Sequence, residues 1–460
     1  MSSPLFAPTT YHERRAELKS KLAGGQILLL GNEESSMNYG DNHYPFRQDS
    51  TFRYFFGLNQ PGLAGLIDVD KDEVILFGND LSMDDIVWTG PQPRMADLAA
   101  SVGVEKVLPT SAIGKSLGGQ VHYLPPYRER NILKLAEWLG KSAFDIQEGN
   151  SLDLIHAVIS LRAYKSDEEI EQLHDAVSIT SLMHQEAMKM ARPGMVEREI
   201  VAHLNEVALS KGAGVSFPPI VTINGQTLHN HYYGNTMQSG RLLLCDSGAE
   251  NLYGYSGDMT RTYPVDPAFS QKQKEVYQIV LDALKSSAEM SKPGVTYQQV
   301  HLNAARVIIS GLKEIGLMSG DVDEAVAQGA HALFFPHGLG HSMGMDVHDM
   351  EDFGENHVGY DDVTPRSTQL GLSALRFGKA LEERLVLTNE PGIYFIPELY
   401  EQWKSEKKLA SFINYDKLAG YMDFGGIRIE NDYVITGEGA QLLGEPAPME
   451  IADVEALRNV

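Results

Sequence analysis

Short apolar runs separated by turn residues fill the first third of the chain. The run 26–30 predicts a buried strand, and the runs 65–69 and 73–77, which flank a short polar turn, predict a β-hairpin. Apolar residues recur with helical spacing over 128–139. This mixture of strands and helices indicates an N-terminal α/β domain that ends near residue 160.

A strong helix-start signal opens the remainder of the chain. In Ser166-Asp167-Glu168-Glu169, the serine and the last glutamate have the spacing of a capping box, which satisfies free amide groups at a helix start. Apolar residues then follow at steps of three and four over 170–177, as on one face of a helix. We therefore place the linker at 162–165 and predict two domains, 1–160 and 161–460.

The second domain contains a weak internal repeat. Pro193-Gly194 and Pro293-Gly294 lie one hundred residues apart, and each separates two helical stretches. A Pro-Gly stop between helices is common, so coincidence is the alternative. If the repeat is real, it predicts two similar αβ halves with a site between them. The strand-like segments that follow the helical pairs are 220–224, 242–246, 257–264, 385–387 and 426–429.

Composition narrows the classes of function. Lys and Arg number 38 against 62 Asp and Glu, and the net charge of −24 argues against nucleic-acid and anionic-membrane partners. We find no signal peptide and no apolar run that approaches the roughly 18–20 residues of a membrane helix. The single cysteine, Cys245, excludes an intrachain disulfide. We expect a soluble cytoplasmic protein with neither nucleic acid nor membrane as partner.

Candidate chemistry begins with two aspartates. Asp246 ends an apolar run, and the chain returns through a turn at 251–254 to Asp258, so a hairpin brings the two carboxylates close together. Two carboxylates at one buried place repel each other unless a cation compensates them. The alternative is one surface aspartate and one capping aspartate.

Two glutamates extend this acidic set. Glu390 follows an apolar run and precedes Pro-Gly, and Glu430 shares one face of an alternating strand with Arg428. An exposed strand face with an ion pair between these two is the alternative for Glu430.

Histidines are concentrated near the same segments. His331, His337, His341 and His348 lie within eighteen residues, and the glycines between His337 and His341 argue against a regular helix and for backbone packed close to a site. A hydrogen-bonded structural role is the alternative for each histidine. Carboxylates with imidazole suit two divalent cations about 3.5–4 Å apart, which activate water for hydrolysis. Oxygen-rich ligation favours Mn²⁺, with Co²⁺, Fe²⁺ or Zn²⁺ as further candidates.

These motifs resemble a known enzyme family. In order they are Asp-x-Gly, Gly-Asp-x-Thr-Arg-Thr, His-Gly-x-x-His, Val-His-Asp, Glu-Pro-Gly and Gly-Ile-Arg-Ile-Glu. The run is similar to that of the pita-bread metallopeptidases, in their proline-specific branch of aminopeptidase P and prolidase, over nearly the whole chain. The resemblance implies an α/β (α+β) protein with a C-terminal pita-bread domain of two αβ halves.

The resemblance also implies the metal ligands. Asp246 matches the first metal aspartate, and Asp258 and Glu430 match the bridging carboxylates. His341, the second histidine of its motif, matches the ligand imidazole. Glu390 matches the ligand that also moves the proton of the attacking water. Twelve positions separate Asp246 from Asp258 where the family commonly has eleven, and we place the extra residue in the intervening turn.

Further roles follow from the same resemblance. His229, His337 and His348 match histidines that support the substrate and the tetrahedral intermediate. His231 is a neighbouring structural residue or a further substrate contact. Arg428 resembles an arginine that pairs with a ligand carboxylate.

The N-terminal domain carries its own match. The segments 46–52 and 54–58 resemble the N-terminal domain of aminopeptidase P, and Trp88 resembles a tryptophan that reaches a neighbouring subunit's active site. A half-exposed tryptophan in the N-terminal core is the alternative for Trp88. The resemblance implies a homodimer or homotetramer.

The activity expected from this resemblance is Xaa-Pro aminopeptidase, acting on a peptide with an Xaa-Pro N-terminus. The match over 46–58 favours this activity over the alternative, an Xaa-Pro dipeptidase (prolidase). A non-catalytic pita-bread binding protein is a more remote alternative, because the sequence carries a metal-binding residue at all five ligand positions of the family. A two-metal phosphoesterase is also chemically allowed, but no phosphate-binding Gly-rich motif is present. The segments 351–370 and 397–420 resemble insertions near the site.

Overall fold

The computed structural model describes residues 4–459, which divide into two compact units. The first comprises the described residues up to Arg162 together with Asp352–His357, and the second comprises the rest. None of the helices formed by residues 4–459 has the length and apolar character needed to cross a membrane.

The first unit is built on a five-stranded sheet in the order β4-β3-β2-β1-β5. The predicted strand and hairpin are confirmed, because β1 to β3 pair antiparallel and Asp68 lies opposite Glu73 at the turn. Short parallel strands extend both edges. The strands are β1 Gln26–Leu30, β2 Ala64–Asp68, β3 Glu73–Phe77, β4 Lys106–Leu108 and β5 Val121–His122.

Helices surround this sheet, and the predicted helix over 128–139 is confirmed as α6. In contrast, α3 buries none of its residues, and its Trp88 is 87% exposed. The alternative that placed Trp88 in the N-terminal core is therefore wrong. The helices of this unit are α1 Pro8–Ser20, α2 Ser50–Phe56, α3 Met83–Thr89, α4 Met95–Ser101, α5 Ile113–Ser116, α6 Glu129–Leu139, α7 Ala143–Glu148 and α8 Leu152–Arg162.

The second unit opens with the predicted capped helix, α9 (Asp167–Met190). The Ser166 hydroxyl accepts from the Glu169 N–H, and the Glu169 carboxylate accepts from the Ser166 N–H. Both halves of the capping box are therefore made.

The internal repeat is present in the structure. Helices α9 and α10 (Glu197–Lys211) flank the first Pro-Gly turn, and α11 (Gln271–Met290) and α12 (Tyr297–Glu314) flank the second. Gly194 and Gly294 both have positive φ, 94° and 85°, which favours glycine. Each donates its N–H over 2.8 Å to a carbonyl, of Met237 or of Leu381, in the segment that precedes a β-strand region of its own half. Equivalent hydrogen bonds show that the two halves are built alike.

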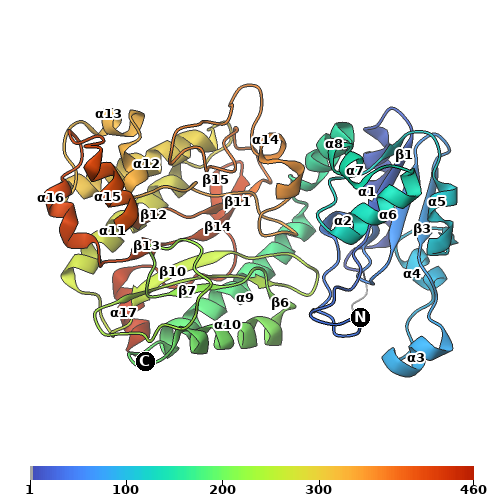
Figure 1. Ribbon diagram of the computed structural model, residues 1–460, viewed down its shortest axis with the longest axis horizontal. Helices are drawn as coiled ribbons and strands as arrows, with labels where there is room; N and C mark the ends of the chain where they lie inside the picture. The colour runs from blue at the N-terminus through green and yellow to red at the C-terminus, as the bar shows by residue number, and fades with distance from the viewer. Residues whose placement is uncertain (1–3, 460) are drawn as a thin grey trace. The chain divides into compact units, whose positions relative to one another are not determined.

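Each half contributes a three-stranded sheet. The first has the order β10-β8-β7 and the second β11-β14-β15, and β12 pairs with β13 beside them. All the predicted strand segments are present. Figure 1 shows the green α9–α10 pair and the yellow α11–α12 pair separated by these strands. The strands are β7 Ile220–Thr222, β8 Leu242–Ser247, β10 Met259–Pro264, β11 Val386–Asn389, β12 Gly392–Tyr394, β13 Gly426–Arg428, β14 Asn431–Thr436 and β15 Gly439–Leu442.

The remaining elements are short and lie mostly outside the sheets. Pairing of β6 with β9 extends the turn between β8 and β10. The short elements are β6 Gly214–Val215, β9 Ala249–Glu250, α13 Val322–Ala327, α14 Glu355–Val358, α15 Pro397–Ser405, α16 Tyr415–Leu418 and α17 Ile451–Arg458. There are also 3₁₀ turns at Thr110–Ala112, Ala330–Leu333, Glu351–Phe353 and Ala419–Tyr421.

The register of β8 and β10 decides where the two aspartates point. Asp246 lies opposite Thr260, and Asp258 lies two residues before Thr260, so all three side chains share one face. Pairing is continuous from 242–247 to 259–264, and the turn between the strands is closed by the Asn251 N–H bond to the Tyr255 carbonyl. The longer spacing therefore turns neither aspartate away from the other.

Candidate metal centre

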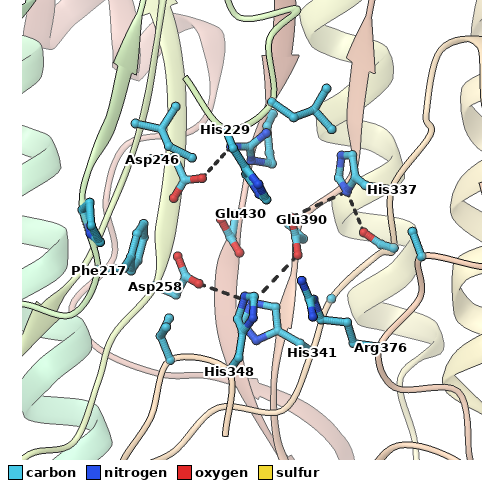
Figure 2. Close-up of a pocket in the computed structure, with 18 of the residues that line it drawn as sticks. Phe217, His229, Asp246, Asp258, His337, His341, His348, Arg376, Glu390 and Glu430 are labelled. Carbon is cyan, nitrogen blue, oxygen red and sulfur yellow. Dashed lines mark hydrogen bonds and ion pairs between the residues drawn. The ribbon is translucent and has the colours of Figure 1, made fainter. Parts of the chain in front are cut away.

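A cavity of about 360 Å³ lies in the second unit, where strand ends of its two halves meet. Figure 2 shows Asp246, Asp258, Glu390 and Glu430 pointing toward its centre. Every predicted site residue of this unit lines the cavity: Asp246, Asp258, His341, Glu390, Glu430, His229, His231, His337, His348 and Arg428. Trp88 belongs to the other unit.

The ligand histidine is placed by the loop that contains both glycines. A Cβ at Gly340 would lie 2.1 Å from the carbonyl oxygen of Thr388, so only glycine permits this close approach to β11. The approach lets the Glu390 N–H bond the Leu339 carbonyl at 2.8 Å. His341 and Glu390 thereby face the same space, which agrees with the interpretation of these glycines from the sequence.

The imidazole of His341 is oriented for ligation. Its Nδ1 lies 3.1 Å from the carbonyl oxygen of Ser342, so hydrogen bonding assigns the proton to Nδ1. The free Nε2 lies 3.4 Å from Asp258 Oδ2 and 4.0 Å from Glu390 Oε1. One donor atom each of Asp258, His341 and Glu430 lies within 4.8 Å of the others. This spacing suits donors around a metal ion.

A chain of hydrogen bonds holds two of the carboxylates from behind. Arg428 donates from Nη2 to Asp246 Oδ2 at 2.5 Å and from Nε to the hydroxyl of Thr260 at 3.1 Å. Thr260 in turn donates to Glu430 Oε2 at 2.6 Å. The second oxygen of Asp246, Oδ1, is buried without a hydrogen-bond partner among the described residues. The same is true of Oδ1 of Asp258. Buried acceptor oxygens without a donor fit a cation.

Electrostatics lead to the same conclusion. Burial, reinforced by Asp246, raises the pKa of Asp258 to about 8. Burial also raises the pKa of Glu390 to about 8, with Arg428 opposing and Asp258 adding to the rise. The pKa of Glu430 is raised well above its ordinary value by burial and then by Asp258. Protein groups alone therefore do not stabilise this set as carboxylates at neutral pH, whereas divalent cations do.

His337 occupies one wall of the cavity and is engaged at both ring nitrogens. Nδ1 lies 2.7 Å from the Gly338 carbonyl oxygen, and Nε2 lies 2.8 Å from the hydroxyl of Tyr394. Arg428 donates to the same hydroxyl at 2.7 Å. Burial lowers the pKa of His337 to about 3, so the ring is neutral at physiological pH.

His348 lies beside His341, with ring centroids 4.1 Å apart. Its Nδ1 is 2.5 Å from Glu351 Oε2, and the other oxygen of Glu351 accepts from Arg376. Arg376 lines the cavity and points inward below Glu390 (Figure 2). His229 lies at the rim with part of its surface exposed, and the partial desolvation of its ring, followed by the charge of Arg428, lowers its pKa.

Three polar residues of this site were missed from the sequence. They are Glu351, Arg376 and Tyr394, which hold or accompany the predicted residues. Arg376 lies in an irregular segment and Tyr394 in a short apolar strand, so neither has a local pattern that indicates a site. The spacing of Glu351 three residues after His348 was the one available signal.

Comparisons with known proteins agree with this geometry. The model of "Metallopeptidase family M24" matches residues 171–437, and that of "Aminopeptidase P, N-terminal domain" matches residues 11–123. The chain is 33% identical to the human Xaa-Pro dipeptidase, over 96% of this chain and 90% of that protein. It is 31% identical to the Xaa-Pro aminopeptidase of Escherichia coli (strain K12), over 97% of each. The structure of aminopeptidase P from E. coli with the inhibitor Pro-Leu superposes with a TM-score of 0.81 at 30% identity, covering 99% of this chain and 98% of that one.

Metal removal is predicted to make stability fall with rising pH. Folding raises the pKa of Asp258 and Glu390 from their ordinary values of 3.8 and 4.5 to about 8, so the metal-free folded state binds more protons than the unfolded chain between these values. The stability contributed by the protonated carboxyls is complete below about pH 4 and is lost as the pH rises through about 8. Calorimetry of EDTA-treated protein should show Tm falling from pH 5 to pH 8. Added Mn²⁺ should abolish the fall, and a Tm independent of both pH and Mn²⁺ would contradict this account.

Thr260 is predicted to support metal binding without being a ligand. Thr260→Val removes the hydroxyl between Arg428 and Glu430, and the loss of such an outer hydrogen bond lowers metal affinity about 10- to 100-fold. Titration calorimetry with Mn²⁺ measures the change. Thr180→Val is the matched control, because this buried hydroxyl bonds only the backbone of Ala176 and Ala249 in the contacts described. Equal Mn²⁺ affinities in the two variants would count against the role of Thr260.

Proposed function

Because the chain belongs to metallopeptidase family M24, with an aminopeptidase P-type N-terminal domain before a pita-bread domain, we propose that it removes the N-terminal residue from peptides with proline in second position. The observation that carries this proposal is the convergence of four carboxylates, three of them buried and that of Glu390 half-buried, with His341 on one cavity. Two of these carboxylates each have a buried oxygen that accepts no hydrogen bond from any residue of 4–459.

The metal content that we propose is two divalent ions, with Mn²⁺ preferred. Oxygen donors supply all but one of the proposed ligands, and such a donor set favours Mn²⁺ over metals that prefer sulfur. When bound, the pair of ions would polarise the scissile carbonyl and activate the attacking water. The ligands would be Asp246, Asp258, His341, Glu390 and Glu430.

Proton transfer is assigned to Glu390. Its Oε1 lies 4.0 Å from Nε2 of His341 in the same cavity, so this carboxylate can reach a water held there. It would take a proton from the attacking water and deliver it to the proline nitrogen, which leaves as a secondary amine. His229, His337 and His348 would stabilise the developing oxyanion from the cavity wall, and Arg428 would keep Asp246 in place. His231 lines the same rim and contacts substrate only if the peptide extends there.

An Xaa-Pro dipeptidase is the second candidate, and Arg376 is the observation that favours it. Arg376 lines the cavity, and its charge opposes the rise in the pKa of Glu390 that burial causes. The carboxylate of a dipeptide lies on the proline itself, close to the scissile bond, and a cavity arginine can bind it. In a longer peptide this position carries an amide.

A substrate-length series distinguishes the two activities. We expect the Mn²⁺-loaded protein to release the first residue of Xaa-Pro-Yaa with a kcat/KM about tenfold or more above that for Xaa-Pro, and EDTA to abolish both activities. Glu390→Gln, which removes the proton carrier, should lower kcat about 10²- to 10⁴-fold and serves as the inactive control. Activity confined to Xaa-Pro dipeptides would replace the first proposal by the second.

We also propose a cytoplasmic homodimer or homotetramer in which Trp88 reaches the neighbouring subunit's active site. The single cysteine supports a reducing compartment. The 87% exposure of Trp88, on a helix that buries none of its residues, supports contact with a second subunit.

The subunit contact predicts that Trp88→Ala lowers kcat/KM about tenfold or weakens oligomerisation, because a large apolar side chain would be lost from the contact. Light scattering and peptide assays at several protein concentrations measure both effects, with Leu133→Ala as the control for an exposed apolar residue elsewhere in the unit. A fully active monomer would refute the contact.

A further inference from the structure

Glu351 joins two cavity residues from behind. One carboxylate oxygen lies 2.5 Å from Nδ1 of His348, and the other accepts from the guanidinium of Arg376. His348 and Arg376 line the cavity, and Glu351 lies outside its lining. The hydrogen bond from His348, with further support from Arg376, lowers the pKa of Glu351 to about 2. The side chain is therefore charged at any working pH.

This arrangement places Arg376 between Glu351 and the cavity. Arg376 lines the cavity, and its side chain points inward below Glu390 (Figure 2). From the other side, Glu351 neutralises the same guanidinium. A dipeptide that offers its own carboxylate to Arg376 must share this cation with Glu351 or displace it. A longer peptide brings no carboxylate to this position and meets no such competition.

We propose that Glu351 is a specificity-determining residue that disfavours dipeptides by holding Arg376. This inference rests on the proposed Xaa-Pro peptidase function and extends it to substrate length. Glu351 touches neither the substrate nor the reacting atoms. It acts through Arg376 on the substrate's C-terminal side and through His348 on the orientation of that ring.

The effect of Glu351 through Arg376 can be separated from its effect through His348 by comparing kcat/KM for two substrates. Glu351→Gln keeps the size of the side chain and a hydrogen bond to His348 but removes the charge that holds Arg376. Any disturbance of His348 affects all substrates alike and cancels in the ratio of kcat/KM for Xaa-Pro to kcat/KM for Xaa-Pro-Yaa. We expect this ratio to rise about tenfold, mainly through a lower KM for the dipeptide.

Two controls assign the change to the carboxylate and its cation. Xaa-Pro amide, which lacks the terminal charge, should gain nothing relative to Xaa-Pro-Yaa in Glu351→Gln. The double variant Glu351→Gln/Arg376→Gln should lose the gain for the dipeptide. Arg376→Gln alone provides a test that does not depend on the folding of the Glu351 variant, and it should lower kcat/KM for Xaa-Pro more than for Xaa-Pro-Yaa.

An unchanged ratio in Glu351→Gln, or an equal gain for the amide, overturns the inference while leaving the peptidase function intact. An equal effect of Arg376→Gln on both substrates overturns it as well. Failure of the unmodified, Mn²⁺-loaded protein to cleave either peptide refutes the proposed function itself, and the specificity role falls with it. The two failures are therefore distinguishable within one set of assays.

Discussion

Repulsion among buried carboxylates is the constraint on which the second unit depends. Asp246, Asp258, Glu390 and Glu430 share one cavity, and burial with mutual repulsion raises the pKa of Asp258 and Glu390 to about 8. Removing such groups from water costs free energy that their hydrogen bonds return only in part. Arg428 brings a single positive charge to the set and Thr260 a single hydroxyl proton. Metal binding at these carboxylates and the stability of the region around them are consequently coupled.

The internal duplication explains how distant segments reach this cavity. Asp246 and Asp258 come from the sheet of the first half, and Glu390 and Glu430 lie at strand ends of the second half. A backbone hydrogen bond joins the two halves beside the cavity: the N–H of Glu430 donates to the carbonyl of Thr260 at 3.0 Å. Neither half contains the whole donor set. The site therefore forms only when the two halves pack against each other.

Much of this architecture could be predicted from local patterns. Three local patterns predicted the geometry that the structure shows. They are the strand that ends at Asp246, the alternation that places Arg428 and Glu430 on one face, and the glycines around His341. Pairing register then brings Asp258 to the face of Asp246. The structure was needed to establish the internal repeat, because a Pro-Gly turn between two helices is too common to show that the halves are equivalent.

Residues that act through long-range contacts could not be found in this way. Tyr394 contacts His337 from a position 57 residues later, and Arg376 lies 25 positions after Glu351, beyond the short helix α14. No periodicity connects such pairs, since tertiary packing alone brings them together. The exposure of Trp88 was implied by the resemblance to a tryptophan that reaches a neighbouring subunit, and no local pattern indicated it, because a short helix of mixed polarity does not reveal whether the unit covers it.

Three of the histidines that line the cavity differ in chemistry because their hydrogen-bond partners differ. A backbone carbonyl at Nδ1 leaves Nε2 of His341 free toward the carboxylates, as a ligand requires. His337 has partners at both nitrogens and a pKa of about 3, so it stays neutral and must exchange a partner to contact substrate. For His348, burial lowers the pKa while the carboxylate of Glu351 opposes that change. Of these three rings, His348 is the one that hydrogen bonds to an ionised side chain, and the same carboxylate also accepts from Arg376.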